Sequence, residues 1–258
     1  MTWGPLMSRA WAEFLKSVKR EWKSLRFEND EECFFRGHME SSWQLQPTLQ
    51  RHCLRQGLKR PAGIRHLEHS LFFEFRSRAR ELHGQSLSDW DVLFYMRHHG
   101  VATRLLDWSE VLGVAVYFAL QNASVKSTPC IWLLNPYALN ERSWKGRDLV
   151  APEYLPQGPY GFQGYLVDHG FDWTKPVALY PLQRSARLHA QQGHFTIHGK
   201  DSRPLDVIVR EVVRKVLLPK EAWKDARRFL KDAGINEYLL FPDLDGLKRH
   251  LHTKYGVE

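Results

Sequence analysis

Hydrophobic and polar positions in one central stretch, residues 88–121, predict two helices joined by a short apolar segment. Ser88 and Asp91 have the spacing of a capping box, and apolar residues at helical spacing follow them as far as Gly100. A glycine there suits a left-handed C-cap, so we predict a helix from Ser88 to Gly100. An unbroken apolar run from Val111 to Leu120 predicts a second helix, buried on most of its faces.

The segment between these helices is where the polar residues gather. Residues 101–106 are short and apolar enough for a strand, and Asp107 with Glu110 again has capping-box spacing. We therefore predict that Asp107 is the N-cap of the second helix. Ala115 and Ala119 lie four residues apart and would let the backbone of that helix approach a sheet closely.

Elsewhere the chain interleaves helical and strand patterns, which predicts a mixed α/β protein of the α+β class. We expect a single domain at residues 29–258, with a largely antiparallel or split central sheet flanked by helices, and an amphipathic helix within residues 1–28. Residues 141–177 are rich in glycine, proline and aromatic residues and are expected to form a long loop insertion. The expected helices are 8–25, 67–82, 221–233 and one from about 244, and the expected strands are 32–38, 130–134, 195–197 and 207–218.

Composition narrows the functional classes only partly. The 258 residues carry a net charge of +8, which favours a polyanionic partner or an anionic cofactor. Three widely spaced cysteines form neither a disulfide framework nor a zinc knuckle, so a reducing cytoplasm is expected. The sequence has no apolar run long enough for a membrane span, and no carboxylate or thiolate at ligand spacing accompanies the histidines, so we expect neither membrane nor metal binding. The sequence has no Walker loop, no GxSxG motif and no HExxH motif, which argues against the enzyme classes that these motifs mark.

Two places in the chain carry candidate chemistry. Arg36 ends an aromatic segment and is followed by Gly37, a suitable shape for holding a phosphate or carboxylate bidentately. The junction before the second helix can hold an anion or a sugar hydroxyl. A structural interpretation is also open, with Asp107 as a cap, Arg104 as its counter-ion and Trp108 as a core residue. The polar residues of the junction are Thr103, Arg104, Asp107, Trp108 and Ser109.

These same residues carry a family resemblance. The segments FFRGH at 34–38 and HHGVATRLLDWSEVLGVAVYFAL at 98–120 resemble the FRG domain family, which occurs mostly in bacterial and phage proteins. Further matching segments are WQLQPTL at 43–49, IWLLNPYALN at 131–140, RLHAQQGHFTIHG at 187–199 and GINEYLLFPDLDGL at 234–247. Arg97 stands where the family usually has glutamine and adds a cation near the proposed site, while Ala102 replaces a proline.

The order of motifs is similar to that of the ADP-ribosyltransferase fold. The resemblance implies an enzyme that uses NAD as its substrate, with Arg36 anchoring the ribose or phosphate. Thr103, with residues 107–109, would take the place of the family's hydroxyl residue on the second strand. Gln191 or Gln192 would take the place of a glutamate that holds the ribose hydroxyl, although glutamine supplies no charge. The implied catalytic residues are Arg36, Thr103, Gln191 and Gln192, and the implied NAD-binding residues are Arg36, Gly37, Arg104, Asp107, Trp108 and Ser109.

Two other functions remain open. One is a non-catalytic module that binds a nucleotide, a nucleic acid or an acidic protein, the last two through basic faces at residues 16–23 and 76–80. The other is a nuclease, which lacks support from any tight cluster of metal-ligating carboxylates. In either the enzyme or the nucleotide module, we expect Arg36, Arg104 and Gln191 to converge on one cleft.

Overall fold

A computed structural model describes residues 7–28, 30–58, 61–83, 87–144, 146–152, 174–180 and 186–257. Most of the loop predicted at 141–177 lies outside the described residues. The strands are β1 Phe34–His38, β2 Leu105–Ser109, β3 Cys130–Leu134, β4 Val177–Leu179, β5 Gly193–Ile197 and β6 Val213–Leu217. The helices are α1 Arg9–Ser24, α2 Thr48–Arg55, α3 Pro61–His83, α4 Asp89–His98, α5 Leu112–Leu120, α6 Pro136–Ser143, α8 Ala186–Ala190, α9 Leu205–Ile208, α10 Trp223–Asp232, α11 Glu237–Leu240 and α12 Leu244–Tyr255, with 3₁₀ turns at Arg210–Val212 and Lys220–Ala222.

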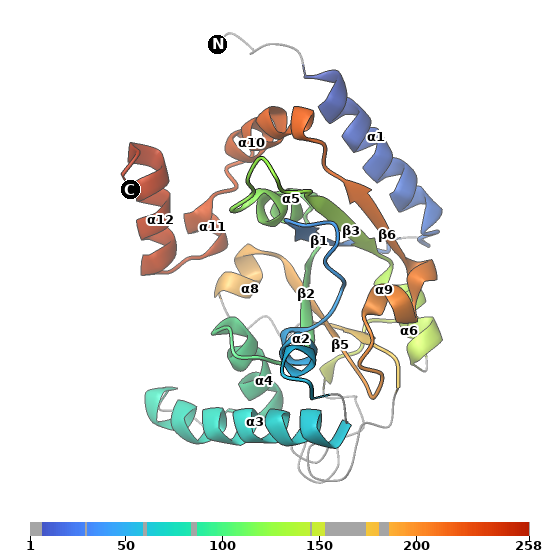
Figure 1. Ribbon diagram of the computed structural model, residues 1–258, viewed down its shortest axis with the longest axis vertical. Helices are drawn as coiled ribbons and strands as arrows, with labels where there is room; N and C mark the ends of the chain where they lie inside the picture. Colours follow the sequence, from blue (N-terminus) through green and yellow to red (C-terminus); the bar gives the residue numbers. More distant parts are fainter. Residues whose placement is uncertain are drawn as a thin grey trace.

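The strands form one antiparallel sheet in the order β4-β5-β2-β1-β3-β6, flanked by helices (Figure 1). The two central strands, β1 and β2, pair only at Phe35 and Ser109. By contrast, β1 with β3, β2 with β5 and β3 with β6 each pair at five positions. The sheet is therefore split at its centre, as the α+β prediction with a split antiparallel sheet allowed.

Hydrophobic packing follows this split. Side chains of directly opposed residues point to the same face of a sheet, so the pairing assigns each strand residue to a face. On one face, α1, α5 and α10 pack over β3 and β6, while α3 and α4 pack over β2, β4 and β5 as a separate cluster. On the other face, a single cluster beneath α6 and α9 joins β1, β2, β3, β4 and β6. The hydrophobic core is thus divided into two clusters on the first face and is continuous on the second.

Helix α5 lies unusually close to β1. A Cβ atom added at Gly37 would stand 1.9 Å from the carbonyl oxygen of Ala115 and 2.7 Å from the amide nitrogen of Ala119. Only a glycine lets a strand and a helix approach this closely. The predicted close approach of the Ala115 and Ala119 face is confirmed, and it places the end of α5 over the Gly37 end of β1.

Several other local predictions are confirmed. Ser88 and Asp91 form the capping box of α4, and α1, Arg9–Ser24, lies within the predicted range 8–25. Strand β3 has the predicted bounds, and Gly234, with a φ of +70°, follows α10. None of the helices in the described ranges combines the length and apolar character needed to cross a bilayer.

The junction before α5 corrects two predictions. The strand is Leu105–Ser109 rather than 101–106, because its pairing with β5 continues to the contact of Ser109 with Gly193. Asp107 consequently lies inside a strand and is not an N-cap. The cap residue of α5 is Val111, which has no side-chain capping bond, and its own amide donates to the hydroxyl of Ser109 at 3.0 Å.

The apolar segment at 207–218 is also different from the prediction of one long strand. Pro204 precedes the short helix α9, and a 3₁₀ turn follows before β6 begins at Val213. Leu205 and Val209 are buried in the core beneath the sheet, so their apolar character reflects packing of a helix rather than of a strand.

Candidate functional site

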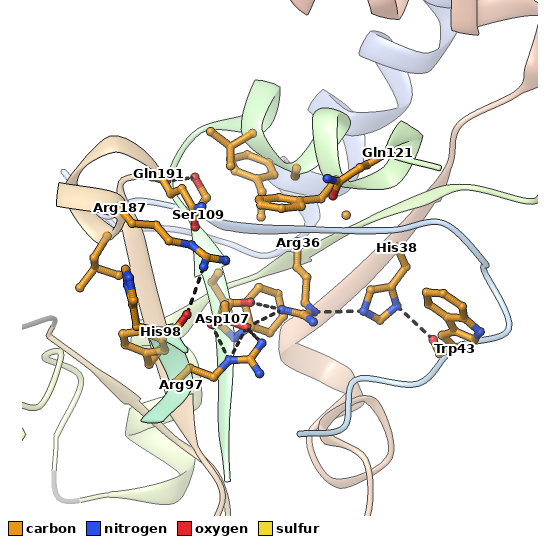
Figure 2. Close-up of a pocket in the computed structure, with 18 of the residues that line it drawn as sticks. Arg36, His38, Trp43, Arg97, His98, Asp107, Ser109, Gln121, Arg187 and Gln191 are labelled. Carbon is orange, nitrogen blue, oxygen red and sulfur yellow. Dashed lines mark hydrogen bonds and ion pairs between the residues drawn. The ribbon is translucent and has the colours of Figure 1, made fainter. Parts of the chain in front are cut away.

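A pocket of about 400 Å³ lies over the split between β1 and β2. Its walls come from both central strands, from α4 and α8 on one side and from α5 on the other, and from the segment that follows β1. Residues from both halves of the molecule therefore face each other across it. Figure 2 shows side chains from these elements around a common centre near Asp107.

Arg36 spans the split in the sheet. Its guanidinium donates to the backbone oxygen of Asp107 at 2.6 Å and approaches an oxygen of the Asp107 carboxylate at 3.4 Å. This side chain therefore links β1 to β2 beyond the point where the backbone pairing ends. Burial lowers the pKa of Arg36 to about 10, partly offset by Asp107, so the group remains a cation at neutral pH.

His38 fixes Arg36 from the other side. Arg36 Nε donates to His38 Nε2 at 3.0 Å, so this ring nitrogen is the acceptor. Nδ1 lies 3.3 Å from the carbonyl oxygen of Trp43 and 3.2 Å from the indole nitrogen of Trp132. Burial, followed by the charge of Arg36, lowers the pKa of His38 to about 3, so the ring stays neutral and keeps its acceptor at physiological pH.

Arg97 holds the carboxylate of Asp107 from α4. Its Nε donates to both carboxylate oxygens, at 2.8 and 3.0 Å, and a terminal nitrogen forms a further bond with one of them. Burial alone would raise the pKa of Asp107, but the adjacent Arg97, helped by Arg36, outweighs burial and lowers it to about 2. Asp107 is therefore ionised at neutral pH, and 36% of its side chain is exposed.

Two further arginines reach the pocket. Arg51 on α2 and Arg97 both donate to the hydroxyl of Thr48, each at 3.1 Å. Arg187 on α8 donates to the carbonyl oxygen of His98 at 3.1 Å and lies 4.6 Å from the ring centre of Phe241. Within the described part of the chain, neither Arg51 nor Arg187 has an ion-pair partner.

The charges around the pocket do not balance. Four guanidinium groups line it, whereas its carboxylates are Asp107, shared by two of them, and Asp91, which is bonded to Ser88 in the capping box. An excess of fixed positive charge in a partly enclosed site attracts an anion. The described residues contain no group of three or more histidine, cysteine or acidic side chains arranged for a metal ion.

Comparison with known proteins identifies one family model that matches part of the chain. Residues 31–128 match the model of the FRG domain. The chain contains an FRG domain. The matched residues run from just before β1 to just before β3 and include Arg36, Arg51, Arg97 and Asp107, while Arg187 and Gln191 lie beyond them. A search of curated proteins and a search of solved structures found no match.

The arginine and glycine of the FRG motif have separate tasks in this structure. Arg36 bridges the split, and Gly37 makes room for α5. Of the residues predicted from sequence, those lining the pocket are Arg36, Gly37, Asp107, Trp108, Ser109 and Gln191.

The polar atoms of three of these lining residues are tied to the surrounding structure. The indole nitrogen of Trp108 donates to Thr196 at 3.1 Å, and the hydroxyl of Ser109 donates to the backbone oxygen of Gln191 at 2.7 Å. The side-chain amide nitrogen of Gln191 donates to the carbonyl oxygen of Leu240 at 2.9 Å. Its amide oxygen is then the atom with which Gln191 can accept a bond from a ligand.

Arg104 does not join the cleft, so the predicted convergence of Arg36, Arg104 and Gln191 is wrong for Arg104. Its guanidinium pairs with Glu68 on α3 and donates to the carbonyl oxygens of His198 at 3.0 Å and Gly199 at 3.2 Å. These partners are buried and draw the side chain away from the pocket. The counter-ion of Asp107 is Arg97, not Arg104.

Thr103 and Gln192 also lie outside the pocket lining. Thr103 is fully buried, and its hydroxyl accepts from the amide of Leu105 at 3.3 Å. Gln192 is an exposed turn residue with a φ of +41°, because the chain reverses there before β5. The placement favours Gln191 over Gln192 as the residue that meets a ligand.

Sequence reasoning missed Arg51, Arg187 and Trp43 as pocket residues. Arg187 and Trp43 belong to segments that resemble the family, and Arg51 follows one of them by two residues. Their position in recurring segments outside the FRG motif was the available signal.

Some residues of each predicted basic face pair with acidic side chains nearby. On α1, Lys16 pairs with Glu13 at 2.9 Å and Arg20 with Glu21 at 3.2 Å. On α3, Arg76 pairs with Asp89 at 3.0 Å, and Arg78 pairs with Glu74 one turn earlier. The side chain of Arg80 lies outside the described residues.

Proposed function

We propose that the pocket over the split between β1 and β2 binds a nucleotide or dinucleotide through its phosphates, with NAD as the first ligand to test. The observation that carries this proposal is the set of four arginines, Arg36, Arg51, Arg97 and Arg187, around the single shared carboxylate of Asp107. Guanidinium groups match phosphate oxygens in both charge and geometry.

The size and lining of the pocket suit such a ligand. Small-molecule sites have volumes of roughly 300–1,000 Å³, and this pocket, of about 400 Å³, falls in that range. Aromatic side chains and amides accompany the arginines, and they supply the stacking surface and hydrogen bonds that a base and a ribose need.

ADP-ribosyl transfer is the reaction that we propose for this ligand. The bond between the ribose and nicotinamide breaks, nicotinamide leaves with the electron pair, and the ribosyl oxocarbenium is captured by water or an acceptor that then loses a proton. Asp107, ionised and partly exposed, is the carboxylate that would face the developing positive charge. Gln191 would accept a bond from the ribose hydroxyl through its amide oxygen.

Calorimetric titration tests the binding proposal. Wild-type protein should bind ADP, pyrophosphate and NAD, and Arg36→Gln or Arg97→Gln should weaken each by roughly 10- to 100-fold, the worth of one charged hydrogen bond. Arg203→Gln is the matched control, because Arg203 is an exposed arginine paired with Asp201 away from the pocket. Absence of binding by wild type, or equal affinities in the pocket variants and the control, would reject the proposal.

Mass spectrometry of NAD incubated with the protein separates the enzyme from a non-catalytic module. Release of nicotinamide by wild type and not by Arg36→Gln or Asp107→Asn would support the transferase. NAD that binds with micromolar affinity and is recovered intact would instead support the module.

Nucleic acid is a second candidate partner, because helices α1 and α10 each expose basic residues. Lys19 and Lys23 on α1 and Lys224 and Arg227 on α10 are exposed. If they follow a phosphate backbone, the logarithm of affinity should fall with the logarithm of salt by roughly 0.7 to 0.9 per phosphate contact. Titration with labelled single-stranded and duplex oligonucleotides at low and physiological salt measures this slope, and a failure to bind at low salt would eliminate this partner.

A further inference from the structure

One aromatic side chain of the pocket differs from the others in its exposure. Trp43 follows β1 and lines the pocket, yet 46% of it is exposed. Other rings of the pocket are half-buried and pack on core rings, as Phe94 does on Phe195 at 5.1 Å and Phe118 on Phe241 at 6.1 Å. The described neighbour of the Trp43 ring is the edge of His38, at 6.1 Å and 64°. A broad indole face is thus left open.

The backbone that carries this indole is held in place. The amide of Trp43 donates to the carbonyl oxygen of Glu40 at 3.1 Å, and its own carbonyl oxygen lies 3.3 Å from Nδ1 of His38. Because His38 also accepts from Arg36, the indole and the guanidinium are linked through one neutral imidazole. The distance between a stacking surface and a phosphate-binding group is therefore set by the fold, which reduces the entropic cost of binding.

Amide side chains lie at the same end of the pocket. Gln121 and Asn122 follow α5, whose last turn lies over Gly37. Gln44 follows Trp43 directly and lines the pocket as well. Figure 2 shows Trp43 and Gln121 on the His38 side of Arg36, with Arg97 and Gln191 on the opposite side. This end of the pocket thus combines an open aromatic face with donors and acceptors suited to the edge of a base.

We propose that Trp43 is the stacking platform for the base of the bound nucleotide, with the phosphates extending from it towards Arg36 and Arg97. The inference rests on the proposed function and assigns the class of ligand, since it requires an aromatic base and not phosphate alone. Stacking of a base on an aromatic side chain is sequence-tolerant because every base has a π-face. The amides of Gln44 and Gln121 then contact the edge of the base.

The experiment compares ADP with inorganic pyrophosphate by calorimetric titration. Trp43→Ala should weaken ADP binding by roughly 5- to 150-fold, the range measured for loss of one stacked base, and should leave pyrophosphate affinity unchanged. Trp43→Phe should recover most of the ADP affinity. Trp22→Ala is the matched control, because Trp22 is similarly exposed, at 38%, and lies on α1 outside the pocket lining.

The other outcomes contradict the assignment in separable ways. Unchanged ADP affinity in Trp43→Ala would place the base elsewhere, while the phosphate proposal would stand. An equal loss for ADP and pyrophosphate in Trp43→Ala, not recovered by Trp43→Phe, would mean that Trp43 only positions Arg36 through His38. Failure of wild type to bind either ligand would overturn both this assignment and the proposed function.

Discussion

Removal of the Arg104 side chain should destabilise the protein without weakening ligand binding in its pocket. Arg104 is 6% exposed and Glu68 is 1% exposed, and the two form a bidentate pair that ties α3 to the start of β2. In Arg104→Ala, the carboxylate of Glu68 would stay buried without its cation, and the carbonyl oxygens of His198 and Gly199 would lose a donor.

Breaking a buried ion pair in this way costs about 3–5 kcal/mol, a large part of a total stability of roughly 5–15 kcal/mol. For a chain of this size, each kcal/mol lowers the melting temperature by roughly 2–4 °C, so the expected decrease is about 6–20 °C. The double variant Arg104→Met with Glu68→Met should recover most of the loss, because apolar residues of similar volume replace the pair without leaving a buried charge.

Urea unfolding followed by circular dichroism measures this effect, with ADP titration below the melting temperature as the second readout. We expect Arg104→Ala to lower the urea midpoint and to keep wild-type affinity for ADP. A loss of less than about 1 kcal/mol would refute the buried-pair account, since a cost that small is typical of exposed pairs. A loss of ADP affinity at unchanged stability would instead indicate that Arg104 belongs to the binding site.

Two further predictions concern close packing and buried histidines. Gly37→Ala should prevent or severely weaken folding, because its Cβ would overlap the α5 backbone at 1.9 Å, whereas Gly63→Ala in α3 meets its nearest described atom at 3.6 Å and should be tolerated. Soluble yield and thermal melting of the two variants check this, and a Gly37→Ala protein as stable as Gly63→Ala would contradict the packing. Burial lowers the pKa of both His38 and His198 to about 3, below the value of about 6.5 in an unfolded chain. The unfolded state therefore takes up protons first, and stability should fall as pH drops from about 6.5 towards 3, a decline that urea midpoints at pH 7.5, 6 and 5 would detect or refute.

Much of the fold follows from local patterns. The apolar spacing of α1, the capping box of α4 and the compact apolar run of β3 are short-range signals that tertiary structure did not override. The junction before α5 behaved differently, because Asp107 with Glu110 has the spacing of a cap and also fits a strand. Its pairing with β5, about 90 residues later in the chain, places Asp107 in a strand.

The candidate site was only partly visible in the sequence for a related reason. Arg97 and Arg104 both flank the same junction, and the residues that each one meets in space decide which faces the pocket. Arg51 and Arg187 reach it from α2 and α8, whose positions depend on long-range packing that no local pattern specifies. Arg36 and Asp107 were candidates on their own chemistry, but their contact across the split sheet required the structure.

A crystal structure of the protein with ADP tests the central claim most directly. We expect the diphosphate in the split between β1 and β2, with phosphate oxygens within hydrogen-bonding distance of the guanidinium groups of Arg36 and Arg97. ADP bound at another surface, or an unoccupied pocket in crystals grown at saturating ADP, would contradict the claim that this arginine cluster is a nucleotide phosphate site.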